Sequence, residues 1–500
     1  MRHGGTCQHD RVRVPRGSFI CAVVLGVVLV AVGGRYGYHR DELYFIEAGH
    51  HLAWGQPDQP VLVPTLAAVW DTITGGHLWA FRILPALAAA LTTIVAALTC
   101  RELGGSRRHQ VAASVLTAVT SIVPGTGHLF STTTFDLLGT ATTIWLLVRA
   151  LRDRRLTSWL LVGLAAGITA EVKVLIFTVL ASCAVGIALT SQRRVLRAPG
   201  PWLAAVMATL LAAPFLLWQA SHGWPMSDVA ASVASGGSTS SADRGTVIPL
   251  SFLMIGPFLS IPFVIGLVHL WRRPSLRWLT IAYAVFLVFV VVSGGKAYYP
   301  AGFFPAVLAA GAIPTLDWLD GRHRTRLAAG VLAVMSIPTA LFSLPLAPQG
   351  STVFEVATAV NPDGAETVGW PAYVETIRKV SRALPDRDNA IVLARNYGEA
   401  GAISLARRDS AVDRELVPPA YSGHNGFAEW GPPPPEATTA IVIGFWPDAE
   451  LAATFTTCTV QTHLETPRDI DNDEDGAPVQ VCRGLVRPWS QSWPALRRLA

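Results

Sequence analysis

Residues 79–108 read WAFRILPALAAALTTIVAALTCRELGGSRR, a long apolar run that ends in a short, arginine-rich segment. About 20 mostly apolar residues are enough for a helix to cross the hydrocarbon core of a bilayer. The apolar run has this length, and Arg101, Arg107 and Arg108 follow it directly. The stretch therefore predicts a membrane-spanning helix with a basic loop at one end.

The same pattern recurs along the chain, which predicts an α-helical polytopic membrane protein with about eleven spans. The apolar blocks cover approximately residues 18–34, 79–100, 111–125, 136–151, 157–171, 174–190, 201–219, 248–270, 278–293, 303–319 and 327–346. Only Glu171 and Lys173 separate the fifth and sixth blocks, so one kinked helix is the alternative there. The first block follows Arg11, Arg13 and Arg16 and would also suit a signal peptide, but we expect an uncleaved span because no convincing cleavage site follows.

Composition excludes several classes of protein. Hydrophobic residues make up 51% of the chain and charged residues 15%, which is too little charge for a soluble enzyme of this length. The net charge of +5 does not indicate a nucleic-acid partner. The sequence contains no Gly-rich nucleotide-phosphate loop, no His-Glu-x-x-His and no Cys-x-x-Cys, so nothing suggests an ATP-driven machine or a structural zinc.

The basic residues predict the orientation of the spans, because short loops rich in Lys and Arg stay in the cytoplasm. One set of loops carries three arginines each: residues 101, 107 and 108; 152, 154 and 155; 193, 194 and 197; 272, 273 and 277; and 322, 324 and 326. The opposite loops carry only Arg35, Arg40, Lys173, Arg244 and Lys296. We therefore expect a cytoplasmic N-terminus (1–17), a transmembrane domain (18–346) with a long first outer loop (35–78), and an extracytoplasmic C-terminal domain (347–500).

The C-terminal region has a different composition, with charges and prolines in place of apolar blocks. Residues 390–394 and 438–445 resemble buried strands, and residues 397–406 and 448–455 resemble helices, which predicts a small α/β domain. Cys458 and Cys482 are the only two of the six cysteines in this polar region. Outside the cytoplasm, these two would be able to form one disulfide.

The first outer loop contains the best candidate for a catalytic base. Residues 38–44 read YHRDELY, and two amphipathic stretches follow, up to Trp54 and up to Trp70. Helices along the membrane surface would place Asp41 and Glu42 at the outer interface, where carboxylates ionise without the cost of a charge at the bilayer centre. The alternative is a solvated acidic pair in a loop.

Two further outer loops carry polar residues at the ends of spans. Asp136 closes the string STTTFD at the start of the fourth span, where the alternative is a simple helix cap. Residues 294–299 read GGKAYY, and an ammonium at Lys296 beside Tyr298 and Tyr299 would be able to hold a lipid phosphate. The alternative is a snorkelling lysine in an aromatic belt. Lys173 is a further outer cation.

Four local strings resemble a known family. They are YHRDELYF (38–45), HGWP (222–225), GKAYY (295–299) and YGEAGA (397–402). Together with the order of spans and loops, they resemble the GT-C glycosyltransferases of family 39, which include protein O-mannosyltransferases and the aminoarabinose transferase that modifies lipid A. The four strings look like those of the bacterial, uncharacterised branch of that family. The resemblance covers about residues 18–346 and is weaker over the tail, which does not resemble the luminal domain of the O-mannosyltransferases.

This resemblance implies transfer of a sugar from a polyprenyl phosphate to a lipid, glycan or protein acceptor at the outer face, with inversion at the anomeric carbon. Asp41 matches the family's catalytic carboxylate or base, Glu42 is its neighbour, and Asp136 matches the acidic residue of the second outer loop. The residues that we expect at the donor phosphate are Lys296, Tyr298, Tyr299, Lys173 and Arg40. We expect no cofactor, since a divalent metal is possible but not required, and membrane lipids but no nucleic acid as further partners.

Two other functions remain open from the sequence. A transporter or flippase of lipid-linked sugars would also be polytopic, but we would expect charges within its spans, whereas the acidic residues here cluster on one side. A non-catalytic protein could bind a cell-envelope polymer through its folded tail, and its acidic pair would then be dispensable. We expect a glycosyltransferase in the cell membrane.

Overall fold

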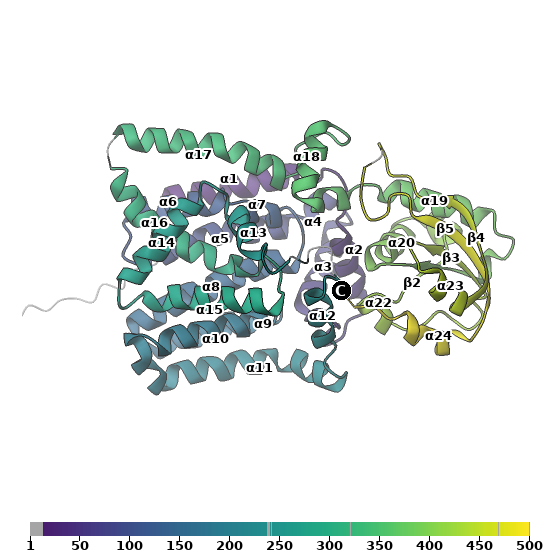
Figure 1. The fold of residues 1–500 in the computed structure, drawn as a ribbon, viewed down its shortest axis with the longest axis horizontal. Helices are drawn as coiled ribbons and strands as arrows, with labels where there is room; N and C mark the ends of the chain where they lie inside the picture. The colour runs from purple at the N-terminus through teal and green to yellow at the C-terminus, as the bar shows by residue number, and fades with distance from the viewer. Residues whose placement is uncertain (1–13, 238–240, 242, 321, 469, 500) are drawn as a thin grey trace, which may run out of the picture.

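The computed structural model describes residues 14–237, 241, 243–320, 322–468 and 470–499. A bundle of long, roughly parallel helices forms one end of the molecule, and a small sheet covered by helices forms the other (Figure 1). Most of the predicted cytoplasmic N-terminus, residues 1–13, lies outside the described residues. The predicted fold class, a helical membrane-protein bundle with a small C-terminal α/β domain, is confirmed.

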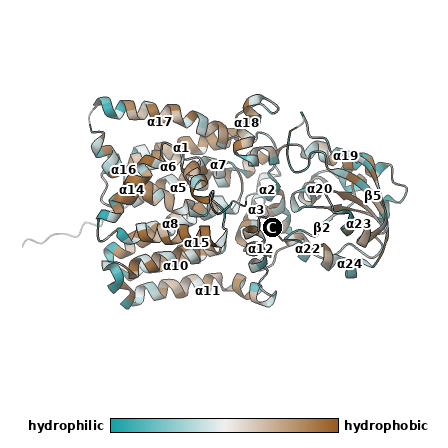
Figure 2. Ribbon diagram, viewed as in Figure 1, coloured by the Kyte–Doolittle hydropathy of each residue, from teal (hydrophilic) through white to brown (hydrophobic). Residues whose placement is uncertain are grey.

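Each of the eleven predicted apolar blocks coincides with a helix or a bent pair of helices. The helices of the bundle are α1 (Arg16–Val32), α5 (Ile83–Glu102), α6 (Arg107–Ala118), α7 (Ile122–Gly127), α8 (Thr132–Asp153), α9 (Leu156–Ala170), α10 (Leu175–Ala188), α11 (Pro199–Ser221), α13 (Val247–Ile255), α14 (Ser260–Arg272), α15 (Arg277–Ser293), α16 (Phe304–Trp318) and α17 (Arg322–Ser343). α9 and α10 are separate helices, so the alternative of one kinked helix is wrong. Apolar residues predominate along these helices (Figure 2).

Length and composition identify fewer complete spans than the sequence pattern predicts. Among the described residues, five helices are long and apolar enough to cross a membrane, or up to seven if each of two bent pairs is one span. One pair is α13 and α14, which meet at 104°. Gly256 at their junction has a φ of 102°, in the left-handed region that favours glycine, and Pro257 follows it. α1, α9 and α15 are shorter apolar helices.

The arginine-rich loops meet at one end of the bundle. Arg152 forms an ion pair with Glu102 at 2.6 Å, and Arg273 donates to the carbonyl of Leu103 at 3.1 Å. Gln192 donates to the carbonyl of Ser275 at 3.1 Å. These contacts join four basic loops, as the predicted orientation requires.

The first outer loop lies at the opposite end and forms three helices, α2 (Arg40–His50), α3 (Leu62–Thr74) and α4 (Leu78–Phe81). α12 (Pro225–Ala234) lies at this end too (Figure 1). The backbone N–H of Leu62 donates to the carbonyl of Glu171 at 3.3 Å, and Gln219 donates to the carbonyl of Gln56 at 3.1 Å. The loop is therefore fixed to the outer ends of α9 and α11.

The C-terminal domain contains one five-stranded sheet in the order β2-β1-β3-β5-β4. Its strands are β1 (Ala390–Ala394), β2 (Ala420–Ser422), β3 (Thr439–Ile443), β4 (Phe455–His463) and β5 (Pro478–Leu485). Its helices are α18 (Thr352–Val360), α19 (Trp370–Arg382), α20 (Tyr397–Asp409), α21 (Ala411–Leu416), α22 (Gly426–Glu429), α23 (Asp448–Thr454) and α24 (Trp489–Leu496). β1 is parallel to β2 and β3, whereas β5 is antiparallel to β3 and β4.

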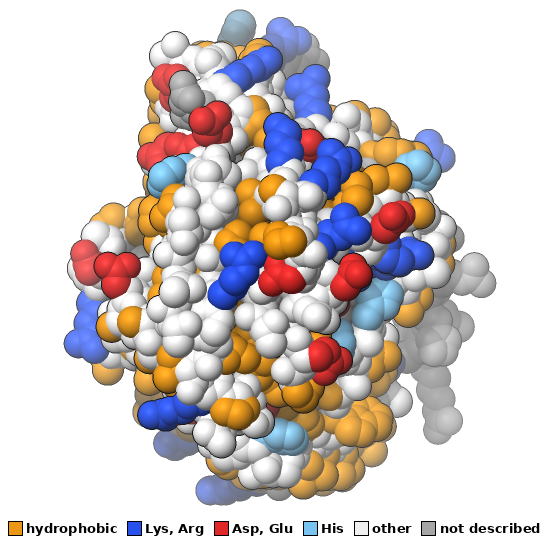
Figure 3. Space-filling model, turned by 90° about the vertical axis from the view of Figure 1, so that its right-hand side faces the viewer, with side chains coloured by type: hydrophobic (Ala, Val, Ile, Leu, Met, Phe, Trp, Pro, Cys, Tyr) orange, Lys and Arg blue, Asp and Glu red, His pale blue; other side chains and the backbone are white. Residues whose placement is uncertain are grey.

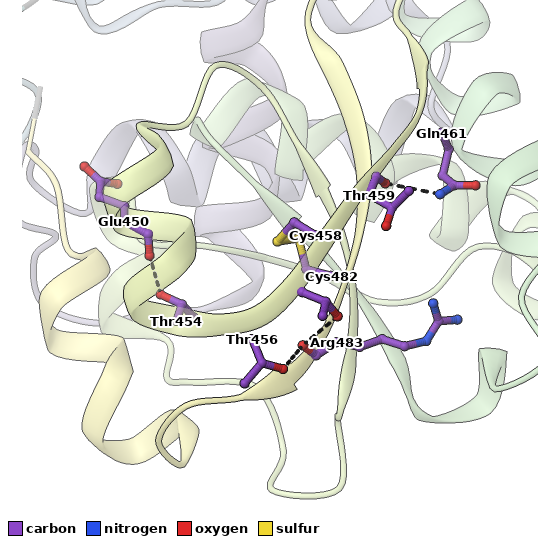
Figure 4. Close-up of a disulfide and its surroundings, with 9 residues drawn as sticks. Glu450, Thr454, Thr456, Cys458, Thr459, Gln461, Cys482 and Arg483 are labelled. Atoms are coloured by element: carbon purple, nitrogen blue, oxygen red, sulfur yellow. Dashed lines mark hydrogen bonds between the residues drawn. A yellow bond between two sulfur atoms is a disulfide. The ribbon is translucent and has the colours of Figure 1, made fainter.

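Two hydrophobic clusters cover the two faces of this sheet. Successive side chains of a strand point to opposite faces, so Val392 and Ile441 belong to one cluster, and Ile391 and Val442 to the other. Cys458 and Cys482 face each other on β4 and β5 and form a disulfide (Figure 4). The outer surface of the domain carries many acidic and basic side chains (Figure 3), unlike the apolar helices of the bundle.

Candidate functional site

The site begins at the N-terminus of α2, where a reciprocal cap fixes the first turn. The backbone N–H of Asp41 donates to His39 Nδ1 at 3.2 Å, and the N–H of His39 donates to Glu42 Oε2 at 2.8 Å. These bonds satisfy donors that have no partner within the helix. The cap therefore fixes the directions in which the two acidic side chains leave the helix.

Glu42 points into the protein. Its carboxylate is fully buried and accepts two hydrogen bonds from Arg82, at 2.9 and 2.7 Å, and one from the N–H of Phe130 at 2.8 Å. Burial raises the pKa of Glu42, but the charge and hydrogen bonds of Arg82 outweigh it and hold the pKa below its ordinary value. Arg82 also donates to the carbonyl of Gly37 at 2.7 Å. Glu42 is an internal structural carboxylate, and it is not at the accessible interface that we expected for it.

Asp41 points toward the C-terminal domain and is partly exposed. The hydroxyl of Tyr397, the first residue of α20, donates to Asp41 Oδ1 at 2.8 Å. The negative charge of Asp41 also adds to burial in raising the pKa of the Tyr298 phenol. A hydrogen bond joins the side chains of Tyr298 and Thr133 in the first turn of α8. Asp41 thus faces the outer ends of the bundle helices.

The predicted cations and Asp136 lie around the same tyrosines. Lys173 lies in the turn between α9 and α10, with its Nζ 5.0 Å from the ring centroid of Tyr298 and 4.5 Å from that of Tyr299. Burial lowers the pKa of Lys173 to about 8, the charge of Asp136 opposes this shift, and the charge of Lys296 adds to it. The charges of Asp136 and Lys296 therefore both act on Lys173.

Arg40 does not belong to this group. Its guanidinium contacts Glu366 at 3.0 Å, Glu474 at 2.7 Å and also Asp473. All three carboxylates come from the C-terminal domain, and Arg40 is buried among them. The prediction that Arg40 contacts a donor phosphate is not supported by this geometry, because the guanidinium joins the two domains instead.

A second carboxylate, Asp58, lies beside Asp41 and was not singled out from the sequence. The hydroxyl of Tyr44 donates to Asp58 Oδ1 at 2.8 Å, and the side-chain amide of Asn425 donates to Oδ2 at 3.1 Å. Burial, with a smaller contribution from the charge of Asp41, raises the pKa of Asp58 to about 6. The only sequence signal was its position in the string QPDQP (56–60) of the first outer loop.

Stacked aromatic rings hold the two carboxylates in place. The rings of Tyr44 and Tyr397 stack with centroids 4.8 Å apart, and each hydroxyl donates to one carboxylate. The ring of His424 lies 4.7 Å from that of Tyr397. Burial lowers the pKa of His424 to about 3, so its imidazole is neutral at physiological pH. Tyr397 stands in the string YGEAGA, but Asp41 lies 356 residues earlier in the sequence, so the contact between them was not predictable.

Among the residues that the structure describes, no group of three or more His, Cys, Asp or Glu side chains is arranged to hold a metal ion. The side chains that the site does offer belong to three kinds of group. These are a partly exposed carboxylate, a second carboxylate beside it, and lysines among tyrosines at the outer ends of the helices.

Comparisons with known proteins agree with this architecture. Residues 58–218 match the sequence profile of the dolichyl-phosphate-mannose-protein mannosyltransferases. No curated protein matches the chain in sequence. The crystal structure of ArnT from Cupriavidus metallidurans bound to undecaprenyl phosphate is similar, with a TM-score of 0.57 at 14% identity, over 93% of this chain and 98% of that chain. An Archaeoglobus fulgidus oligosaccharyltransferase tethered with an acceptor peptide has a TM-score of 0.51 at 11% identity, over 76% of this chain and 62% of that chain.

The matched region is similar to the protein mannosyltransferases, and the fold is similar to that of ArnT. The resemblance inferred from the four sequence strings is therefore confirmed. The matched profile includes Asp136 and Lys173 but begins after Asp41.

Proposed function

We propose that the chain transfers a sugar from a polyprenyl-phosphate donor to an acceptor at the outer face of the cell membrane, with Asp41 as the base. One observation carries this proposal: the charge of a partly exposed carboxylate, Asp41, acts on Tyr298, whose ring lies 5.0 Å from Lys173 Nζ. A base and cations at one membrane boundary are what a lipid-phosphate donor requires. The similar ArnT structure holds undecaprenyl phosphate, which supports this class of donor.

The reaction is an inverting displacement. Asp41 takes the proton of an acceptor hydroxyl as that oxygen attacks the anomeric carbon from the side opposite the phosphate. The new carbon–oxygen bond forms while the bond from the anomeric carbon to the phosphate oxygen breaks, and the electron pair leaves with the polyprenyl phosphate. General base catalysis of this kind contributes typically about 10²- to 10⁴-fold.

The lysines act on the leaving group. Negative charge grows on the phosphate as the glycosidic bond breaks, and cations already in place stabilise it in a site shielded from water. Lys173 and Lys296 supply that charge, and the hydroxyls of Tyr298 and Tyr299 are suited to donate to phosphate oxygens. Asp136, whose carboxylate accepts from Thr140 at 3.2 Å, orients Lys173 by its opposite charge. The leaving group is a monophosphate, so the two lysines balance its charge without a divalent metal.

The test uses purified full-length protein in detergent with undecaprenyl-phosphate-linked mannose, glucose and aminoarabinose, and a cell-envelope fraction as the source of acceptors. Wild-type protein should release undecaprenyl phosphate from at least one donor, and Asp41→Asn should reduce release about 10²-fold or more. Asp448→Asn, which changes an exposed carboxylate on α23, is the matched control and should keep full activity. Wild-type activity in Asp41→Asn would reject the assigned role of Asp41.

A further inference from the structure

The C-terminal domain and the first outer loop share one hydrophobic core. Leu43 of α2 is buried in the same cluster as Val392 and Ile441 of the sheet. On the neighbouring side of α2, Tyr44 is buried with Ala394, Ala400 and other residues of both domains. The C-terminal domain therefore packs directly against α2, the helix that carries Asp41.

Two glycines bring α20 into direct contact with α2. A Cβ atom at Gly398 would lie 2.6 Å from the Cβ of Arg40, and one at Gly401 would lie 2.9 Å from the Cβ of Leu43. Neither distance is possible without movement of the backbone, so glycine permits the close approach. This contact places the N-terminus of α20 at the N-terminus of α2, where Asp41 lies.

Tyr397 is fixed at that point by its own helix cap. The side chain of Asn396 accepts from the N–H of Glu399 at 2.9 Å, and Glu399 accepts from the N–H of Asn396 at 3.1 Å. The Tyr397 ring is then held between those of Tyr44 and His424. With its backbone capped and its ring packed between two others, the hydroxyl has a defined position from which it donates to Asp41.

A second loop of the domain contacts the other carboxylate. Asn425 has a φ of 49°, and its N–H donates to the carbonyl of Arg498 at 2.9 Å, which fixes the loop before α22. From there its side-chain amide reaches Asp58. The N–H of Gly426 donates to the Tyr44 hydroxyl at 3.0 Å, so the same loop also orients the phenol that donates to Asp58.

We infer that the C-terminal domain completes the active site, with Tyr397 as a positioning residue for Asp41 and Asn425 as a positioning residue for Asp58. The inference rests on the proposed function, in which Asp41 is the base. The Tyr397 hydroxyl holds one carboxylate oxygen of Asp41, so that the other faces the acceptor. Asn425 holds Asp58 beside it. Docking of the domain, not the membrane bundle alone, therefore sets the geometry of the base.

The test compares two tyrosines of the same domain. Tyr397→Phe removes the hydroxyl that donates to Asp41, whereas Tyr373→Phe removes a buried hydroxyl without a hydrogen-bond partner among the described residues. In the undecaprenyl-phosphate release assay, Tyr397→Phe should lower kcat about 10- to 100-fold, because small displacements of a catalytic group are that costly. Its donor KM should stay within about twofold of wild type, because the phosphate site is untouched. Tyr373→Phe should leave both constants unchanged.

The split between kcat and donor KM separates positioning from a general loss of structure. A loss of a buried hydroxyl that merely weakens the fold should lower activity in Tyr373→Phe as well, whereas a positioning role predicts a lower kcat at constant donor KM in Tyr397→Phe alone of the two. Asn425→Gly keeps the positive φ, removes the amide, and should also lower kcat at constant donor KM. Both variants should elute as monodisperse protein in detergent.

Two outcomes overturn the inference in different ways. Wild-type kcat in Tyr397→Phe, in an assay where Asp41→Asn is inactive, would overturn the positioning role and leave the proposed function standing. Full activity of Asp41→Asn would overturn the proposed function and the inference together.

Discussion

Two adjacent acidic residues at the start of α2 have opposite surroundings. Consecutive side chains on an α-helix leave the axis about 100° apart, so Asp41 and Glu42 cannot share one environment. Glu42 turns toward Arg82 and the N–H of Phe130, whereas Asp41 turns toward Tyr397. The two residues therefore have different roles: Glu42 stabilises the loop from which Asp41 projects.

This division predicts a difference in stability. Glu42→Gln removes the charge opposite the buried guanidinium of Arg82, and breaking a buried ion pair by changing one partner costs about 3–5 kcal/mol. We expect the variant to unfold at a clearly lower temperature in detergent, as followed by circular dichroism. Asp41→Asn, the matched change one residue away, should alter the Tm little, because its carboxylate is partly exposed. Equal Tm values for the two variants would contradict the structural role of Glu42.

Lys173 predicts a pH dependence of donor binding. Burial lowers its pKa to about 8, so the free enzyme loses this positive charge as the pH rises through about 8. If Lys173 binds the donor phosphate as proposed, its hydrogen bond to that charged group contributes about 1.5–3 kcal/mol, so we expect the donor KM to rise about tenfold or more between pH 7 and 9.5.

The matched variant for this prediction is Lys173→Arg, whose guanidinium stays charged throughout that range. Its donor KM should be flatter above pH 8, whereas Lys379→Arg, on an exposed position of α19, should follow the wild-type curve. A donor KM independent of pH in the wild type would remove Lys173 from the phosphate site.

At the scale of elements, the sequence was informative wherever one segment determines its own structure. An apolar block covers each helix of the bundle, but the breaks between α6 and α7 and between α13 and α14 were not predicted. The surface helices expected around Asp41 and Trp70 correspond to α2 and α3. In the C-terminal domain, the buried runs of β1 and β3 were predicted, but β4 was not. β4 is an edge strand with mostly exposed side chains, so it lacks the alternation that identifies a half-buried strand.

The site was only partly predictable for the same reason. Asp41, Asp136, Lys173 and Lys296 stand at the ends of predicted helices, so topology alone assigns them to one side. The contacts of Asp58, Tyr397 and Asn425 depend on how α20 and the loop before α22 dock onto α2. Arg40 was misassigned because its acidic partners lie more than 300 residues further along the chain.

The contact between α2 and α20 can be tested by a change of one methyl group. Gly401→Ala places a Cβ about where the Leu43 side chain and backbone lie, so α20 must shift away from α2. We expect transfer activity to fall about tenfold, because Tyr397 moves with its helix. Gly330→Ala on α17 is the matched control: nothing lies within 4 Å of its added Cβ, so activity should be unchanged. Equal activity of both variants would show that the tight contact does not position the site.

At the scale of the whole molecule, the arginine-rich loops and the candidate functional site lie at opposite ends of the bundle. The arginine-rich loops contact one another at one end. The first outer loop, the candidate site and the disulfide-bonded domain lie at the other. Positive loops stay in the cytoplasm, and disulfides persist outside it, so two independent physical rules predict the same orientation. A donor lipid would therefore be used on the outer face.

This orientation predicts which cysteines react with a membrane-impermeant maleimide on intact cells. Ala449→Cys lies on an exposed position of α23 in the C-terminal domain and should be labelled before the cells are permeabilised. Ser191→Cys lies on an exposed position among the basic loops and should be labelled only afterwards. The unaltered chain measures the background from its own thiols, of which Cys100 and Cys183 are buried and Cys21 is partly buried. The reverse pattern would place Asp41 on the cytosolic side, and a base there would have no access to a donor presented at the outer face.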